Sequence, residues 1–334
     1  MKLGFGIAAA VALITTVAAS ANDGVAESTA GGLVLKHTDD IDMVSEDLYV
    51  SADQIRVRYV FRNRTPRDVR VTVAFPMPDR DLDLLRYEGA NYPADFATRV
   101  DGRDVAMQVE RRAFARGVDR TALLERLGLP LLPDDLATEV SAAADSLTRE
   151  QQRQLVDLGL LEASDHDLGE GTRNYWEPIW TVKETWYWEQ TFPAGRDLVV
   201  EHRYTPGVGM SLGSNLSVPE MRSEPAVQAW MRRYCVDRAF MAAVDRMIAG
   251  STPERPVMLG ERTIGYILTT GAGWRSPIGS FRLVVDKGRP DNIVSFCGEN
   301  VRRISPTQFE MRRTNWRPDR DLAVLILTPN REEE

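Results

Sequence analysis

Two segments near the N-terminus alternate between apolar and polar residues, and this alternation constrains the fold more than any other feature. In residues 55–61 every second side chain is Ile, Val, Tyr or Phe, and in residues 69–75 every second one is Val or Phe. Because side chains of a strand point alternately to its two faces, each segment is expected to bury one face. The turn-like residues 63–68 lie between them, so the pattern predicts an antiparallel hairpin with one solvated face.

The rest of the chain mixes strand-like and helical segments. Asp101-Gly102 predicts a second hairpin, because both central residues of a type I′ turn need positive φ. Thr148 and Gln151 form a capping-box pattern at the start of the third of three short helices, expected at 119–127, 133–144 and 148–159. A polar loop is expected at 164–171, and a helical stretch at 223–248 with a break around 235–237. Further strands are expected at 180–192, 198–204, 263–270, 281–285, 293–297, 309–311 and 322–327.

These elements predict a mainly β protein, built from two antiparallel β-sandwich units with helical insertions. We expect a signal peptide over residues 1–21, an N-terminal sandwich over 22–112 and a helical insertion over 113–171. A C-terminal sandwich is then expected over 172–334, with its own helical insertion at 223–250.

The first 21 residues have the pattern of a secretory signal peptide. Lys2 precedes an uncharged apolar run over residues 3–17, and Ala19-Ser20-Ala21 supplies the small residues of a cleavage site. No later apolar run approaches the roughly 18 residues that span a bilayer, so no transmembrane anchor is expected after cleavage. We therefore expect a periplasmic protein, with secretion as the alternative. The formal net charge of −8 gives no attraction to nucleic acid.

Cys235 and Cys297 are the only two cysteines of the chain. In an oxidising compartment such a pair is most simply a disulfide. The alternative is a metal or redox pair, but the chain has no C-x-x-C motif and its three histidines are distant in sequence. The pattern therefore favours a structural bridge between the second helical insertion and a C-terminal strand.

Aromatic and acidic residues are concentrated in residues 175–189. Alternation over 180–188 puts the tryptophans on one strand face, which favours a core, whereas Tyr175 and Trp176 precede that strand in a loop-like segment. Glu184 is in phase with the tryptophans, so a buried carboxylate with a partner, such as an arginine, is expected there. Exposed aromatics beside acids would suit sugar binding or a pair of catalytic carboxylates. The candidate binding residues are Tyr175, Trp176, Glu184 and Glu189.

Two short motifs match known reactive sites only in part. Residues 209–213 match G-x-S-x-G, but all three histidines precede Ser211, opposite to the order in α/β-hydrolases. Residues 165–167, Asp-His-Asp, lack the glutamate at the twelfth loop position that a calcium-binding EF-hand requires. We therefore predict no catalytic nucleophile, no metal ligand and no cofactor.

Six blocks of sequence resemble the bacterial family called domain of unknown function 4424. They are FPMPD at 75–79, GVDRT at 117–121, WEQTFPAG at 188–195, LTTGAGW at 268–274, SFCG at 295–298 and PDRDL at 318–322. The resemblance covers nearly the whole chain after residue 21. It implies an exported protein without an assigned activity, and it carries over no catalytic residue.

Two hypotheses about function follow. The first is a non-catalytic β-sandwich protein of the periplasm that binds an envelope protein or a glycan. The alternative is a hydrolase that acts on cell-envelope polysaccharide through a pair of carboxylates drawn from Glu177, Glu184 and Glu189. A closed aromatic core favours the first, and an open cleft with two acids about 5–10 Å apart favours the second.

Overall fold

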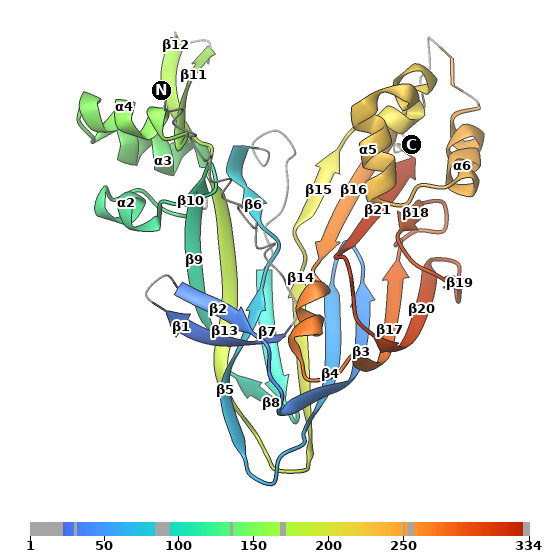
Figure 1. The fold of residues 1–334 in the computed structure, drawn as a ribbon. Coiled ribbons are helices and arrows are strands. Elements are labelled where there is room, and N and C mark those ends of the chain that lie inside the picture. Colours follow the sequence, from blue (N-terminus) through green and yellow to red (C-terminus); the bar gives the residue numbers. More distant parts are fainter. Residues whose placement is uncertain are drawn as a thin grey trace, which may run out of the picture.

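The computed structural model describes residues 23–29, 32–83, 94–133, 136–167, 172–249, 251–252 and 257–329. The expected signal peptide lies outside these residues. The described chain is mainly β, with antiparallel sheets and a few helices, as the sequence predicts (Figure 1). No described helix is long and apolar enough to cross a membrane.

Two large sheets form most of the molecule. Sheet A has the order β10-β9-β13-β5-β1-β2, and β6 also pairs with β13. Its strands are β1 (Gly24–Thr29), β2 (Gly32–Lys36), β5 (Val69–Pro76), β6 (Arg80–Asp81), β9 (Gln108–Ala115), β10 (Val118–Asp119) and β13 (Thr181–Phe192). Sheet B has the order β19-β20-β17-β3-β4-β14-β7-β8. Its strands are β3 (Ile41–Val50), β4 (Ile55–Asn63), β7 (Ala94–Val100), β8 (Arg103–Val105), β14 (Asp197–Thr205), β17 (Ile278–Asp286), β19 (Arg302–Arg303) and β20 (Gln308–Trp316).

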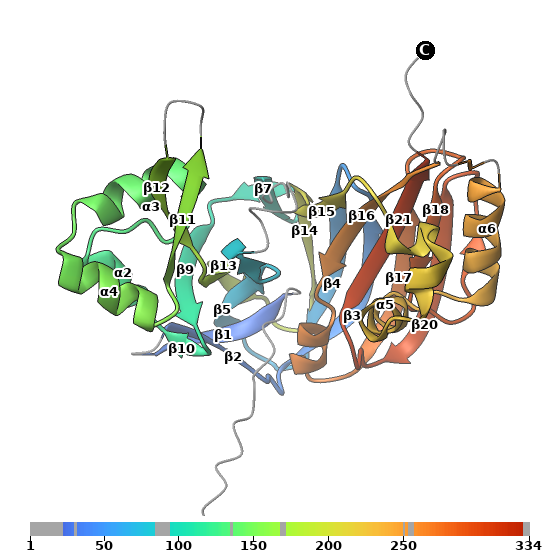
Figure 2. The same ribbon diagram turned by 90° about the horizontal axis from the view of Figure 1, so that it is seen from above.

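Two smaller sheets each accompany a group of helices at opposite ends of the molecule (Figures 1 and 2). Sheet C pairs β11 (Leu161–Asp167) with β12 (Thr172–Pro178), beside α2 (Thr121–Arg126), α3 (Leu136–Asp145) and α4 (Arg149–Asp157). Sheet D has the order β15-β16-β21-β18, and its strands are β15 (Val208–Ser211), β16 (Leu259–Tyr266), β18 (Ile293–Phe296) and β21 (Leu322–Pro329). Near sheet D lie α5 (Pro225–Arg233), α6 (Arg238–Ile248) and the 3₁₀ turns η1 (Asn215–Ser217) and η2 (Pro219–Ser223), whereas η3 (Thr269–Gly273) follows β16.

Three apolar cores hold these layers together. The largest joins the inward faces of sheets A, B and D, and includes Tyr59, Phe75, Trp274 and Val324. A second core packs α2, α3 and α4 against β9, β13 and β11, around Trp180. A third packs α5 and α6 against sheet D. Sheet B therefore turns one face to the core and leaves the other for solvent.

The prediction that residues 55–75 form a hairpin is wrong, because its two strands do not pair with each other. Both segments are strands with the expected burial alternation, but β4 belongs to sheet B and β5 to sheet A. Residues 63–68 cross between the two sheets. Asn63, which is buried, donates from Nδ2 to the carbonyls of Arg67 (2.8 Å) and Phe192 (2.9 Å), and so fixes the crossing to sheet A. Alternation specifies which face is buried, but it does not specify the partner strand.

The sheets also cross the expected domain boundaries. β3, from the expected N-terminal sandwich, pairs in parallel with β17 from the expected C-terminal one. In the same way β13 pairs with both β5 and β9. Sheets A and B therefore each combine strands from both parts of the chain.

Several local predictions are confirmed. Asp101 and Gly102 both have positive φ, at 46° and 76°, in the turn that joins β7 to β8. Thr148 and Gln151 form a complete capping box at the start of α4. The helical stretch at 223–248 is divided into α5 and α6. However, the segment around Tyr175, expected to be a loop, is strand β12, paired with β11, which includes part of the expected polar loop.

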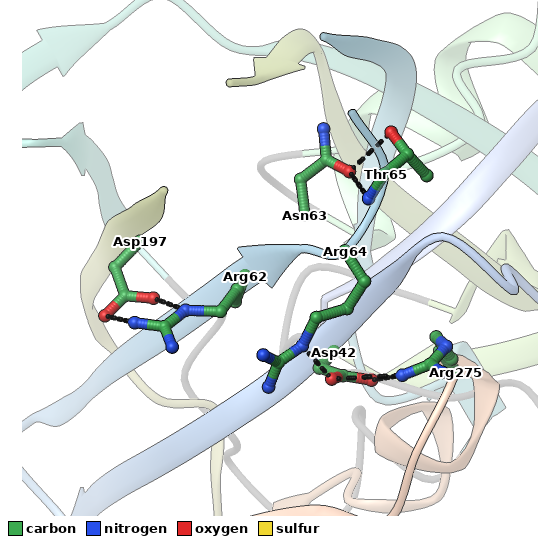
Figure 3. A network of polar contacts seen from close by, with 7 residues as sticks. All are labelled: Asp42, Arg62, Asn63, Arg64, Thr65, Asp197 and Arg275. Atoms are coloured by element: carbon green, nitrogen blue, oxygen red, sulfur yellow. Dashed lines mark hydrogen bonds and ion pairs between the residues drawn. The ribbon is translucent and has the colours of Figure 1, made fainter. Parts of the chain in front are cut away.

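A cluster of charged side chains ties β3 to later parts of the chain (Figure 3). Asp42 is buried, and its carboxylate accepts from Nε of Arg64 (2.5 Å) and from Nη1 of Arg275 (3.2 Å). Burial opposes ionisation, but these hydrogen bonds outweigh it and hold the pKa of Asp42 below its ordinary value. The neighbouring Arg62 pairs instead with Asp197, which contacts neither Arg64 nor Arg275 in this network.

Cys235 and Cys297 form the expected disulfide, between the α5–α6 connection and the end of β18. The bridge closes a loop with a sequence separation of 62. In the chain-entropy model, a loop of that length corresponds to a stabilisation of about 3–4 kcal/mol. We expect the double variant Cys235→Ser/Cys297→Ser to lose that free energy of unfolding, measured by urea denaturation. Dithiothreitol should destabilise the wild type and leave the variant unchanged; equal sensitivity of both would contradict the bridge.

Candidate functional site

The solvated face of sheet B carries a cavity. Along β4 and β14, buried apolar residues alternate with more exposed charged ones, so the charged residues share the outer face. The cavity has a volume of about 660 Å³ and is a groove across β8, β7, β14, β4, β3, β17 and β20. Its size is that of a small-molecule site.

One row of side chains across this groove alternates strictly in charge. Strand register places the row, from β8 to β17, in the order Asp104, Arg99, Glu201, Arg58, Asp47, Arg282. Within it Arg99 pairs with Asp104 at 2.7 Å, and Arg282 with Asp47 at 3.1 Å. Opposite charges on directly facing positions stabilise a sheet, so this row is balanced within itself.

The next row does not alternate. It runs from β7 to β17 in the order Ala97, Arg203, Arg56, Tyr49, Val284. Arg203 and Arg56 are directly opposite each other on neighbouring strands, and both are exposed. Neither has a carboxylate within ion-pair distance among the described residues. Like charges in facing positions destabilise a sheet, so this pair is a local electrostatic cost to the fold.

Tyr49 holds one of these two arginines in place. The guanidinium of Arg56 lies over the Tyr49 ring, 4.3 Å from its centroid, which is a cation–π contact. The Tyr49 hydroxyl donates to Asp286 Oδ2 at 3.1 Å. Burial and the nearby Asp286 raise the pKa of Tyr49, so the phenol stays protonated as a donor at neutral pH. Arg56 is therefore preorganised over a fixed ring.

A second pair of facing arginines in sheet B shows how the fold balances such charges. Arg282 and Arg312 are opposite each other on β17 and β20. Glu310 accepts from both at 2.9 Å, and from Arg302 at 2.5 Å. Hydrogen bonds from Arg312, Arg282 and Arg302 lower the pKa of Glu310 from its ordinary 4.5 to about 2. The Arg56–Arg203 pair has no equivalent carboxylate among the described residues.

The Glu310 cluster makes stability depend on pH. A carboxylate with a lowered pKa in the folded state stabilises the protein fully above its unfolded pKa and loses that contribution as pH falls through its folded pKa. Glu310→Gln should therefore lower the free energy of unfolding by about 1–3 kcal/mol at pH 7, as for hydrogen bonds to charged groups. The gap should shrink as pH falls from 4.5 towards 2, measured by urea unfolding. The exposed Glu299→Gln is the control, and a gap independent of pH would contradict this account.

A family model for a domain of unknown function, DUF4424, matches residues 21–325, which is nearly the whole chain. The chain belongs to the DUF4424 family. A solved structure from Legionella pneumophila, described as a "putative nutrient binding protein", is similar with 13% identity and a TM-score of 0.44. That match covers 92% of this chain and 70% of the other. No curated protein shows significant similarity.

Glu184 is buried, as its position in the alternating strand predicts. Its side chain is 3% exposed. Oε1 accepts from Arg80 Nη2 (3.1 Å) and Trp186 Nε1 (3.0 Å), and Oε2 accepts from Arg111 Nε (2.7 Å). Both oxygens are engaged inside the protein, so the geometry favours a structural role for Glu184.

The other three candidate binding residues are spread over two sheets. Glu189 lies on the opposite face of β13, is half exposed, and contacts Thr72 at 2.5 Å and Arg70 at 3.3 Å. Tyr175 and Trp176 are half-buried on β12, and Trp176 packs against the helical core. Binding by these residues stays a prediction. Neither these three residues nor Glu184 line the groove on sheet B.

A buried acid, imidazole and hydroxyl form a chain that the sequence does not reveal. Asp23 Oδ1 lies 3.0 Å from His202 Nε2, and Thr98 Oγ1 lies 2.8 Å from His202 Nδ1. Burial raises the pKa of Asp23 although His202 opposes this. The order of groups resembles a hydrolase triad, but all three residues are at most 2% exposed. These three hydrogen-bonded side chains therefore anchor the start of β1 in the core.

The structure describes the serine motif in full, but of the Asp-His-Asp motif it describes only the backbone. Within the residues that the structure describes, no group of three or more His, Cys, Asp or Glu is placed to hold a metal ion. The side chains of Asp165, His166 and Asp167 lie outside the described part. Ser211 ends β15, and its hydroxyl donates to the carbonyl of Gly213 at 2.8 Å.

The sequence analysis did not identify the arginines of the groove as binding residues, although their positions on the polar faces of two strands were visible in it. Arg56 and Arg58 occupy the polar positions of the alternating segment at 55–61, and Arg203 is a polar position of 198–204. Each reads there as an ordinary solvated residue. Only the register between β4 and β14 places Arg56 and Arg203 side by side.

Proposed function

We propose that this protein is an exported binding protein whose ligand occupies the groove on the outer face of sheet B. The observation that carries the proposal is the groove itself, a cavity of about 660 Å³ lined by charged residues of six strands. A rigid sheet with its other face packed on a core positions such side chains accurately. The ligand is a polar compound of small-molecule size, such as a solute or a fragment of an envelope glycan.

The alternative, a hydrolase acting through paired carboxylates, has less support. Its leading carboxylate, Glu184, is enclosed, and three donors occupy its oxygens. The acids of the groove, Asp47, Asp104 and Glu201, face arginines in the balanced row. Each of these carboxylates is thus already held by a guanidinium of the same row.

Export is proposed from the sequence of residues 1–21 together with the cysteine pair. Ala19-Ser20-Ala21 provides a cleavage site, and a structural disulfide is typical of oxidising compartments such as the periplasm. Intact-mass measurement of protein isolated from its native cells should give a chain that starts at Asn22. A chain that retains Met1, or that stays in the cytoplasm, would contradict export.

The site is tested by blocking the groove without changing its charge. Ala97 is exposed on the groove floor, so Ala97→Tyr places a ring in the cavity. Ser280→Tyr adds the same ring to an exposed position of the same sheet that does not line the cavity. Calorimetry with a panel of sugars, sugar phosphates and dicarboxylates should find a ligand whose affinity falls at least tenfold in Ala97→Tyr only. A ligand that binds both variants as it binds the wild type would contradict this site.

A further inference from the structure

The charge of the groove is unbalanced, and the imbalance comes from one place. Five arginines line it, namely Arg56, Arg58, Arg99, Arg203 and Arg282, against the three carboxylates of Asp47, Asp104 and Glu201. The alternating row contains three arginines and all three of these acids. The excess of two positive charges is therefore Arg56 and Arg203.

The arrangement of these two arginines fits a ligand better than it fits the fold. Where sheet B places Arg282 opposite Arg312, Glu310 bridges them. Arg56 and Arg203 occupy facing positions with no such carboxylate among the described residues, so the repulsion expected of like charges in facing positions is left uncompensated. Residues that lower the stability of the fold and make no compensating contact within it are characteristic of functional sites.

The chemistry of two arginines in facing positions defines the group that would compensate their charges. Each guanidinium presents five N–H donors in a planar fork that matches carboxylate and phosphate oxygens in pairs. Facing residues of neighbouring antiparallel strands have Cα atoms roughly 4.5–5.5 Å apart, so one anionic group can contact both. The Tyr49 ring keeps Arg56 oriented, which reduces the ordering that binding requires.

We propose that the groove holds its ligand through a dianionic group, a phosphate monoester or a dicarboxylate, bound between Arg56 and Arg203. This inference rests on the proposed function and adds the chemical class of the ligand. Ala97, which is exposed, follows Arg203 in the same row, so the sheet offers an apolar contact at that end of the anion site.

The test compares Arg56→Gln and Arg203→Gln with Arg58→Gln, which removes an equal charge from the balanced row. Glucose 6-phosphate and succinate serve as dianionic probes, with glucose and succinamide as their neutral counterparts. Calorimetry at about 0.3 M salt limits long-range charge effects. We expect at least one dianion to bind and its neutral counterpart to bind at least tenfold more weakly. Arg56→Gln and Arg203→Gln should each weaken that dianion at least tenfold, and Arg58→Gln less than threefold.

Melting temperatures separate binding from a structural role. Removing either member of a repelling pair should leave the unliganded melting temperature unchanged or raise it, whereas loss of a structural arginine lowers it. Neutral probes that bind as well as dianions, or an Arg58→Gln effect as large as that of Arg203→Gln, would overturn the proposal. If Ala97→Tyr weakens a ligand that the two arginine variants bind normally, the groove stands as the site and the dianion assignment fails. If Ala97→Tyr, Arg56→Gln and Arg203→Gln all bind the ligand as the wild type does, both the groove as the site and the dianion assignment fail.

Discussion

Trp274→Ala should lower the free energy of unfolding by about 3–5 kcal/mol, the usual cost of truncating a large buried aromatic side chain. Trp274 is fully buried, and its ring centroid lies 4.5 Å from that of Phe61 and 6.2 Å from that of Phe192. Its Nε1 also donates to the carbonyl of Asp23 at 2.8 Å, so the variant leaves a buried acceptor without its donor.

Trp316→Ala is the matched control for this variant. Trp316 also contacts a phenylalanine at 4.5 Å, Phe281, but it is only half-buried. Its truncation should cost clearly less, about 1–2 kcal/mol, because less apolar surface returns to water. Both losses are measured by urea denaturation at one temperature. Equal losses for the two variants would contradict the central position of Trp274 between sheets A and B.

Glu184→Leu should also destabilise by about 3–5 kcal/mol, because it breaks a buried ion pair by removing one partner. Arg80 is 7% exposed and would lose the carboxylate that faces it, and Trp186 would lose its acceptor. Glu189→Leu changes a neighbouring residue of β13 whose contacts with Arg70 are exposed, so its cost should be about 0–1 kcal/mol.

This pair of variants also distinguishes a structural role of Glu184 from a catalytic one. Thermal unfolding of both proteins, run beside an assay against envelope polysaccharides, gives the comparison. If Glu184→Leu kept the stability of the wild type and abolished a measurable turnover, Glu184 would be a catalytic group and the hydrolase hypothesis would return.

The sequence predicts the elements of this fold much better than their partners. The alternation at 55–61 and 69–75 correctly indicates two half-buried strands, because side-chain direction is a local property of a strand. The pairing of β4 with β14 joins residues such as Arg56 and Arg203 that are distant in sequence, and alternation carries no information on such pairing. The disulfide was predictable, because the chain has only two cysteines.

The same distinction applies to the site. The burial of Glu184 and its arginine partners followed from its phase within a tryptophan-rich strand. The groove could not be predicted in this way, since it depends on the lateral order of seven strands, which includes the parallel pairing of β3 with β17. An arginine on a solvated face is ordinary until its neighbours are known. Its significance here comes from the absence of a facing carboxylate among the described residues.

The most direct test of the groove as a dianion site is to locate the ligand. A crystal structure of the mature protein with the tightest-binding dianionic probe should place its anionic group within hydrogen-bond distance of the guanidiniums of both Arg56 and Arg203. The same probe should be absent from crystals of Arg203→Gln grown under the same conditions. A probe bound elsewhere, for instance on sheet C beside Tyr175 and Trp176, would contradict the account.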